Sequence, residues 1–223
     1  MELFDTTLFH DNPQDALNFI SSILEASTEY SIIATDLDGK IILWNVGACK
    51  IYGYEPAEVI GKMYTGALYA PEEMKKGLPK KIIDETLKNG KFEGTALRIR
   101  KNGEQFTARL VMTIRRDISG KSDGFLLVSK DISYEIELAQ RAEKKFKGLL
   151  ESAPDAIVIV GKKGMISLVN AQTEKFFGYK REELLGQAIE ILIPERYRKK
   201  HPGVRLFLFY AGEKIPEGCV VLL

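Results

Sequence analysis

A segment in the first quarter of the chain recurs, without a gap, 125 residues further on. Residues 36–61 align with residues 161–186, and nine of the 26 aligned positions are identical. Three of the shared residues are glycines, and most of the other apolar positions remain apolar. Chance similarity would not keep the glycines in register with the apolar pattern, so the repeat indicates two tandem copies of one domain. A chain of 223 residues is long enough for two small domains.

Both copies open with the same predicted elements. Two short apolar runs flank a glycine, which predicts a β-hairpin over 31–44 and again over 157–169. Asn45 and Asn170 then stand where a helix begins, and asparagine is a good N-cap. Gly53 and Gly178 mark the expected end of that helix.

Copy one continues with a helical pattern over 71–89, in which Pro79 predicts a break or a late start. Three alternating runs follow at 92–101, 105–115 and 125–130, and Asn102-Gly103 is a strong hairpin turn between the first two. The order strand, strand, helices, strand, strand, strand predicts an α+β domain.

A long helical stretch that opens at 131–133 and runs to about 152 joins the copies, and a shorter one covers 18–27. Each has an apolar stripe at steps of three and four residues. Two interpretations stay open: the stripes pack on their own domain, or the helices pair between subunits. The second interpretation predicts a homodimer formed through the N-terminal or the linker helix.

Composition excludes several classes of protein. With 32 Lys+Arg against 31 Asp+Glu, the chain has no charge pattern for direct nucleic-acid or anionic membrane binding. Two cysteines cannot form a disulfide framework, residues 1–11 do not resemble a signal peptide, and no apolar run approaches the roughly 18 residues of a membrane span. We therefore expect a reduced, cytoplasmic, soluble protein. No motif of a hydrolase, zinc protease, P-loop or kinase is present, so we expect no enzyme.

Several short motifs carry a specific resemblance. They are D-x-D-G-x-I-x-x-W-N at 36–45, Y-G-Y at 52–54, K-N-G-E-x-F at 101–106 and K-D-I-S at 130–133. Copy two has E-S-A-P-D-A at 151–156 and F-G-Y at 177–179. These runs resemble a PAS domain. The resemblance implies the PAS fold, a five-stranded antiparallel sheet with short helices on one face, followed by a linker helix and a partial second PAS domain.

The resemblance also predicts the domain boundaries and the state of copy two. We expect an N-terminal segment at 1–16, PAS domain 1 at 17–133, a linker helix at 134–151 and partial PAS domain 2 at 152–223. The repeat offset places the last strands of copy two beyond Leu223. Copy two is therefore expected to lack them, which leaves an open edge on its first strand unless another strand completes the sheet. A truncated or frame-shifted chain would explain the loss.

PAS domains enclose a pocket for a small ligand, and copy one allows that pocket to be drawn. The predicted ligand-pocket residues are Trp44, Asn45, Leu68, Ile83, Leu87, Thr95, Leu97, Leu110, Met112 and Leu127. Ile33, Leu43 and Ser129 are also expected to point inward. An apolar cavity with few polar groups suits a small ligand, and a filled core fits the same residues.

The cofactor is left unassigned, with none as the first expectation. Trp44 beside Asn45 resembles flavin-binding redox sensors of the family, so a non-covalent flavin stays open. Cys49 lacks the motif of the thiol-adduct light sensors and is expected to be a small core residue. His201 resembles the proximal ligand of haem-binding PAS domains, although Pro202 follows at once. No metal site is otherwise expected.

These observations favour a cytoplasmic signal-transduction module. A ligand, a redox state or another cue in copy one would change a helix arrangement that a downstream signalling protein reads. The alternatives are a ligand-free dimerisation or protein-interaction module, and a fragment of a sensor histidine kinase or another multi-domain regulator.

Overall fold

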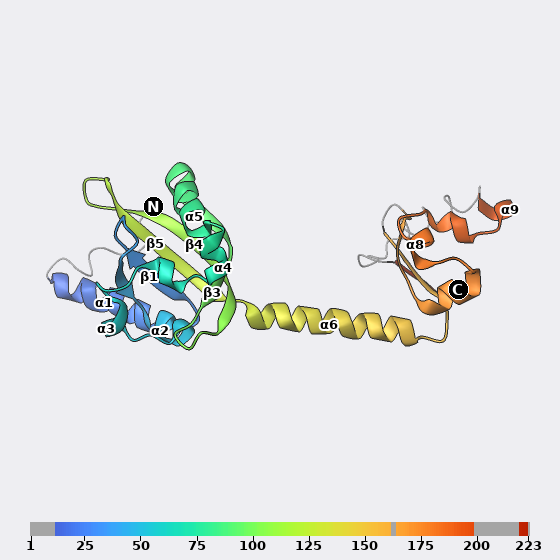
Figure 1. Ribbon diagram of the computed structural model, residues 1–223, viewed down its shortest axis with the longest axis horizontal. Helices are drawn as coiled ribbons and strands as arrows, with labels where there is room; N and C mark the ends of the chain where they lie inside the picture. Colours follow the sequence, from blue (N-terminus) through green and yellow to red (C-terminus); the bar gives the residue numbers. More distant parts are fainter. Residues whose placement is uncertain (1–11, 162–163, 199–218, 223) are drawn as a thin grey trace. The chain divides into compact units, whose positions relative to one another are not determined.

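The computed structural model describes residues 12–161, 164–198 and 219–222. Contacts divide the chain into two compact units, the first reaching to Glu137 and the second beginning at Leu138. Helix α6 (Ser133–Ser152) runs through this division as one continuous helix (Figure 1).

The first unit is built on a five-stranded antiparallel sheet with the order β2-β1-β5-β4-β3. Its strands are β1 (Ser31–Thr35), β2 (Ile41–Trp44), β3 (Lys91–Ile99), β4 (Gln105–Arg116) and β5 (Ser122–Asp131). The last strand lies between β1 and β4, so residues from both ends of the unit meet in the centre of the sheet. The predicted α+β class and five-stranded sheet are confirmed.

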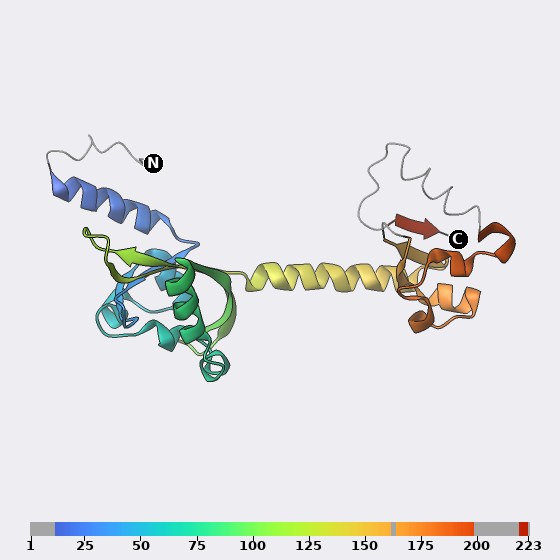
Figure 2. The same ribbon diagram turned by 90° about the horizontal axis from the view of Figure 1, so that it is seen from above.

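Most helices of this unit come between β2 and β3 in the sequence. They are α2 (Val46–Tyr52), α3 (Pro56–Val59), η2 (Thr65–Leu68), α4 (Pro71–Lys75) and α5 (Leu78–Asn89), and α1 (Pro13–Ala26) precedes β1. Figure 2 shows α5 lying across the strands, and α5 buries Ile82 and Thr86. The predicted break falls at Gly77, which has a φ of 69°, and Pro79 stands in the first turn of α5.

The register of β3 decides which side chains reach the core. Arg98 lies opposite Phe106 of β4, and Gly94 lies opposite Leu110. Residues directly opposite in a sheet share a face, so the even-numbered side chains of β3 point inward with Phe106 and Leu110. The prediction that Thr95 and Leu97 point inward is wrong by one residue, and a slip of one residue reverses the face. Thr95 is exposed and Leu97 is half-buried on the opposite face.

The second unit repeats the beginning of the first. Its elements are β6 (Ile157–Val160), β7 (Ile166–Val169), α7 (Ala171–Phe177), α8 (Arg181–Leu184), η3 (Ile189–Leu192), α9 (Glu195–Arg198) and β8 (Cys219–Leu222). Strand β8 pairs antiparallel with β6, with Val221 opposite Val158. Of the two outcomes expected for the first strand of copy two, an open edge or completion by another strand, the structure shows the second. The pairing gives β6 the kind of antiparallel neighbour that β5 gives β1.

The repeated asparagines tie each hairpin to the helix before it. Asn45 Oδ1 accepts hydrogen bonds from the Ile32 and Ala48 amides, and its Nδ2 donates to the carbonyls of Ser27 and Tyr30. In the second unit, Asn170 accepts in the same way from the Ile157 and Thr173 amides and donates to the carbonyls of Leu150 and Asp155. Both predicted N-caps are confirmed. In the sequence, α6 directly precedes β6 as α1 directly precedes β1.

Candidate functional site

The inner face of the first unit's sheet and its helices enclose one apolar core. Of the predicted pocket residues, five are buried members of this core: Trp44, Leu68, Leu110, Met112 and Leu127. Ile33, which was also expected to point inward, is buried in the same core, and Ile83 packs against the core while partly exposed. The structure therefore brings these seven side chains together around a single interior.

Other predicted pocket residues lie elsewhere. Leu87 is 50% exposed, because α5 turns Ile82 and Thr86 inward in its place. Leu43 pairs with Ala34 outside the core cluster and is half-buried. Asn45 is buried, but all its polar atoms are used in the bonds described above, so it positions the hairpin.

Arg98 is a residue of this core that the sequence patterns do not predict. Its side chain is on the inner face of β3 and is 0% exposed. Its Nε donates a hydrogen bond to the Tyr52 hydroxyl at 3.1 Å, and its guanidinium lies 3.9 Å from the centroid of the Tyr69 ring. Neither Nη1 nor Nη2 has a hydrogen-bond partner among the described residues.

The guanidinium keeps its charge in this interior. Burial is the largest influence and by itself lowers the pKa of Arg98, but the phenols of Tyr52 and Tyr69 outweigh it and the pKa is raised. Burial in turn raises the pKa of Tyr69, against the effect of the neighbouring Arg98 charge. Within the described residues, the core therefore contains a cation whose two Nη nitrogens lack a hydrogen bond of normal geometry, and the nearby Tyr69 phenol contributes to raising its pKa.

Two hydroxyl groups on the same inner face are also unsatisfied. Ser31 of β1 lies opposite Ser129 of β5, and both are buried. Neither Oγ has a hydrogen-bond partner in the described part of the chain. Buried polar groups are almost always paired, so these two hydroxyls and the Nη atoms of Arg98 are candidates for contact with a bound molecule.

The residues considered for cofactors have other visible roles. Trp44 donates its indole N–H to the Tyr54 carbonyl at 3.1 Å, and its ring lies 5.5 Å from that of Tyr52. Cys49 is partly buried against the core, and burial, followed by the Glu55 charge, raises the pKa of its thiol. A raised pKa lowers the thiolate fraction and thereby the reactivity. His201 lies outside the described residues.

A surface hollow of about 360 Å³ adjoins this part of the core. It is lined by residues 50–53 of the first helix after the hairpin and by residues 100–102 of the β3–β4 turn. Tyr52 lines this hollow, and its hydroxyl accepts a hydrogen bond from the buried Arg98.

The end of β5 is fastened to the beginning of α6. Asp131 accepts a hydrogen bond from the Ser133 amide at 2.9 Å and forms an ion pair with Arg100 at 2.5 Å. The Ser133 hydroxyl accepts from the Thr107 amide, and the Ile132 amide donates to the Thr107 carbonyl. Three segments that are distant in sequence therefore meet where the helix begins.

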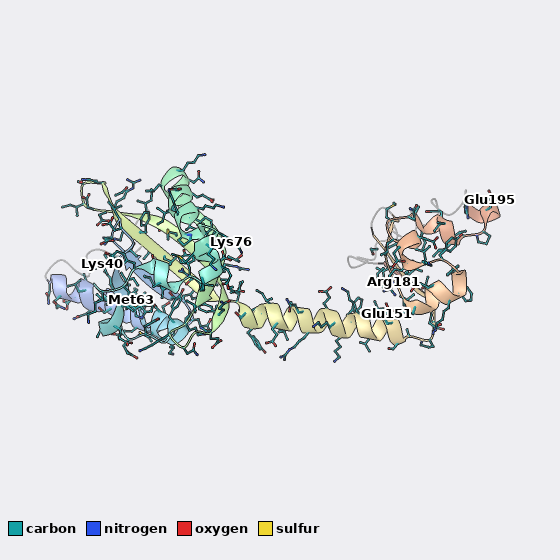
Figure 3. All side chains as sticks on the ribbon, viewed as in Figure 1. Lys40, Met63, Lys76, Glu151, Arg181 and Glu195 are labelled. Atoms are coloured by element: carbon teal, nitrogen blue, oxygen red, sulfur yellow. The ribbon has the colours of Figure 1, made fainter. Side chains whose placement is uncertain are left out.

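The far end of α6 is fastened in the second unit. Glu151 forms an ion pair with Arg181 of α8 at 2.5 Å, and the labelled side chains point toward one another in Figure 3. Glu151 also accepts from the Ala171 amide, while Asn170 binds the Leu150 carbonyl.

Two further searches concern the described residues alone. Within them, no helix combines the length and apolarity needed to cross a membrane. Within the same residues, no group of three or more His, Cys, Asp or Glu side chains is arranged to hold a metal ion.

Comparisons with known proteins agree with this architecture. A family model described as a PAS domain matches residues 28–133, and one described as a PAS fold matches residues 144–205. Two-component system protein A of Emericella nidulans is 32% identical over 111 residues, which are 50% of this chain and 16% of that protein. Sensor protein FixL of Bradyrhizobium diazoefficiens is 32% identical over 77 residues, which are 34% of this chain and 15% of that protein. The chain thus spans about a sixth of the length of these relatives.

A solved structure shows the same fold. The PAS domain of a protein from Colwellia psychrerythraea superposes with a TM-score of 0.50 at 24% identity, over 54% of this chain and 99% of that one. The sheet order, the helices on one face of the sheet and the two family matches lead to one conclusion. The chain belongs to the family of proteins built from PAS domains.

Proposed function

We propose that this chain is a non-catalytic signal-sensing module whose first PAS domain binds a small molecule in its core. The observation that carries the proposal is the set of buried, unsatisfied polar atoms of Arg98, Ser31 and Ser129 on the inner face of one sheet. A bound molecule would supply a partner at one or both of these two places, the Arg98 guanidinium and the serine pair. The likeness to a two-component system protein and a sensor protein supports a role in signalling.

Ligand binding can be followed without a label, because Trp44 is the single tryptophan of the chain and is buried in this core. Its fluorescence during heating therefore reports the unfolding of the first domain alone. A ligand that binds the native state raises the unfolding midpoint by mass action. We expect at least one compound of a small-molecule library to raise the midpoint measured from Trp44. A library without any such compound would overturn the sensing function and favour a ligand-free interaction module.

The second part of the proposal is a relay through α6. The first turn of this helix is bonded to Thr107 of β4 and to Asp131 of β5, so a change in the packing of these strands alters the support of the helix. In the second unit the last turn of α6 is held by Asn170 and Arg181. The helix is thus the output of one PAS domain and the entry to the next.

Limited trypsin digestion tests the relay. Lys144 and Lys145 are exposed on α6, so their cleavage reports how firmly the helix is held. We expect a ligand of the first domain to change this cleavage rate, and we expect Asp131→Ala to remove the change while the ligand still raises the Trp44 midpoint. Identical coupling in the wild type and in Asp131→Ala would show that the signal does not pass through this junction.

We also propose that the chain forms a homodimer through its helices. Leu17, Ile20 and Ile23 of α1 are each more than half exposed and recur at helical spacing, which makes an apolar stripe. A second copy of the same helix would cover this stripe with an equivalent one. Sedimentation should show a dimer for the wild type and a monomer for Ile20→Glu, whereas a monomeric wild type would exclude this arrangement.

A further inference from the structure

We infer that the first domain recognises a small organic acid, and that Arg98 binds its carboxylate group. This inference rests on the proposed sensing function and specifies its ligand. The argument begins with the charge. Arginine does not lose its proton in proteins, so the buried guanidinium needs a counter-charge or hydrogen-bond acceptors inside the core. In the described part of the chain, no carboxylate forms an ion pair with Arg98.

The free edge of the guanidinium fits a carboxylate. The Nε edge is used by the Tyr52 hydroxyl, and one face of the planar group is covered by the Tyr69 ring. What remains is Nη1 and Nη2, which make no hydrogen bond of normal geometry with any described residue, although the Tyr69 phenol is near enough to contribute to the raised pKa. Two adjacent N–H donors on one plane match the two oxygens of a carboxylate, which they bind through parallel hydrogen bonds.

The surroundings of Arg98 limit the charge of the ligand. Leu68, Phe106 and Ala96 near Arg98 are almost completely buried, so water does not screen this part of the core. A ligand with one negative charge neutralises Arg98, while a dianionic phosphate would leave one charge uncompensated in an apolar interior. The surface hollow is lined by Tyr52, the same residue that accepts a hydrogen bond from Arg98.

The serine pair lies at a second level of the same face. From Arg98, the inner-facing positions of β3 lead through Ala96 to Gly94, and Gly94 stands in the row of Leu110 and Ser129. Four residues of strand separate the two levels by about 13 Å. Ser31 and Ser129 are therefore not needed for carboxylate binding, and the inference depends on Arg98 alone.

The experiment compares acids with their own amides in the full chain. Acetate, propionate, lactate and butyrate are each paired with the corresponding neutral amide, and inorganic phosphate is added as a separate arm. The readout is the unfolding midpoint from Trp44 fluorescence at pH 7.5. At a ligand concentration of about one hundred times Kd, the midpoint should rise by about 10 °C. We expect at least one acid to give a saturable rise that its amide does not give.

Variants assign the effect to Arg98. Arg98→Met removes an uncompensated buried charge, so the domain should fold and the response to the acid should be lost. Arg98→Lys keeps the charge without the paired donors, and it should weaken the apparent affinity by about ten-fold or more. The matched control is Arg109→Met, because Arg109 is exposed on the neighbouring strand, and its response should equal that of the wild type.

Each other outcome has a definite meaning. An amide as effective as its acid, a response to phosphate alone, or an unchanged response in Arg98→Met would overturn the carboxylate inference while ligand sensing stands. If neither these compounds nor a wider library moves the midpoint, both the inference and the proposed function are wrong.

Discussion

Asn45 offers a sharp test of how the first domain is held together. Its side chain is buried and joins three segments: the chain after α1, strand β1 and the start of α2. The carbonyl oxygen accepts two amide hydrogens at 2.8 and 2.9 Å, and the amide nitrogen donates to the Ser27 and Tyr30 carbonyls at 2.9 and 3.0 Å. The substitution Asn45→Ala removes these four bonds, together with a longer one of 3.3 Å to the Leu24 carbonyl, and leaves their backbone partners with fewer acceptors and donors.

The expected loss follows from these bonds. Removal of an N-cap costs about 1 kcal/mol. The remaining three hydrogen bonds contribute roughly 1 kcal/mol each, although the loop carbonyls can recover part of that from water. The free energy of unfolding of the first domain should therefore fall by about 3 kcal/mol. For a domain of this size that lowers the midpoint by about 12 °C.

The assay is thermal unfolding followed by Trp44 fluorescence, with Asn170→Ala as the matched control. Asn170 makes the same kinds of bonds in the second unit, so its loss should leave the Trp44 transition unchanged. A midpoint for Asn45→Ala within about 2 °C of the wild type would refute the reasoning, because the bonds would then contribute almost no stability. An equal fall in Asn170→Ala would show that the two units do not unfold separately.

Three further predictions use the same fluorescence readout. In Gly124→Ala the new Cβ would lie 1.9 Å from the Thr35 carbonyl oxygen, so we expect loss of the folded domain. The control Gly103→Ala, at a glycine with a φ of 88° and open space around it, should cost only about 1 kcal/mol of stability. A stable Gly124→Ala would show that β1 and β5 are not paired as described. Leu110→Ala should reduce the stability by about 2–5 kcal/mol, and Leu110→Asp should unfold the first domain because Leu110 is 0% exposed; normal melting of Leu110→Asp would place this residue outside the core. Burial by itself raises the pKa of Asp131, but hydrogen bonds from Ser133 and Arg100 together lower it. The contribution of Asp131 to stability is therefore present above its unfolded pKa of about 3.9 and is lost as the pH falls through its folded pKa. Asp131→Asn should flatten the dependence of stability on pH below about pH 4, and an unchanged loss of stability in acid would contradict this assignment.

Much of the fold could be predicted from the repeat and its turn residues. The Asn45 and Asn170 caps, the glycines that end α2 and α7 and the separate strands of the first unit follow from local rules, and the structure agrees with them. These features depend on short stretches of chain, where backbone geometry is set by the residues themselves. The assembly of these strands into one antiparallel sheet was implied by the resemblance to PAS domains.

The candidate site was harder to predict because it depends on strand register. Leu97 and Thr95 were placed inward since apolar residues usually face the core, but β3 turns its alternate residues, including Arg98, to that side. The pairing of Ile99 with Gln105 across the turn fixes Arg98 opposite Phe106. A two-residue turn at Asn102-Gly103 pairs Lys101 with Glu104 and therefore places Leu97 opposite Ala108. The observed register is shifted from this by one residue, so neither the turn motif nor hydrophobic alternation predicts the buried arginine.

Which segment completes the sheet of copy two could not be predicted, for a different reason. At the repeat offset, the four residues of β8 align with residues 94–97 of β3, which pairs with β4 and not with β1, so the repeat does not predict the pairing of β8 with β6. Pairing between distant segments is specified by the completed fold and leaves little trace in local patterns.

The central claim is that a ligand in the first domain is coupled to the beginning of α6. Hydrogen exchange measured on the full chain, with and without a compound that raises the Trp44 midpoint, tests this most directly. The account predicts slower exchange of the Thr107, Ile132 and Ser133 amides, whose bonds join β4 and β5 to the helix. Unchanged exchange at these three amides, while the midpoint rises, would contradict it.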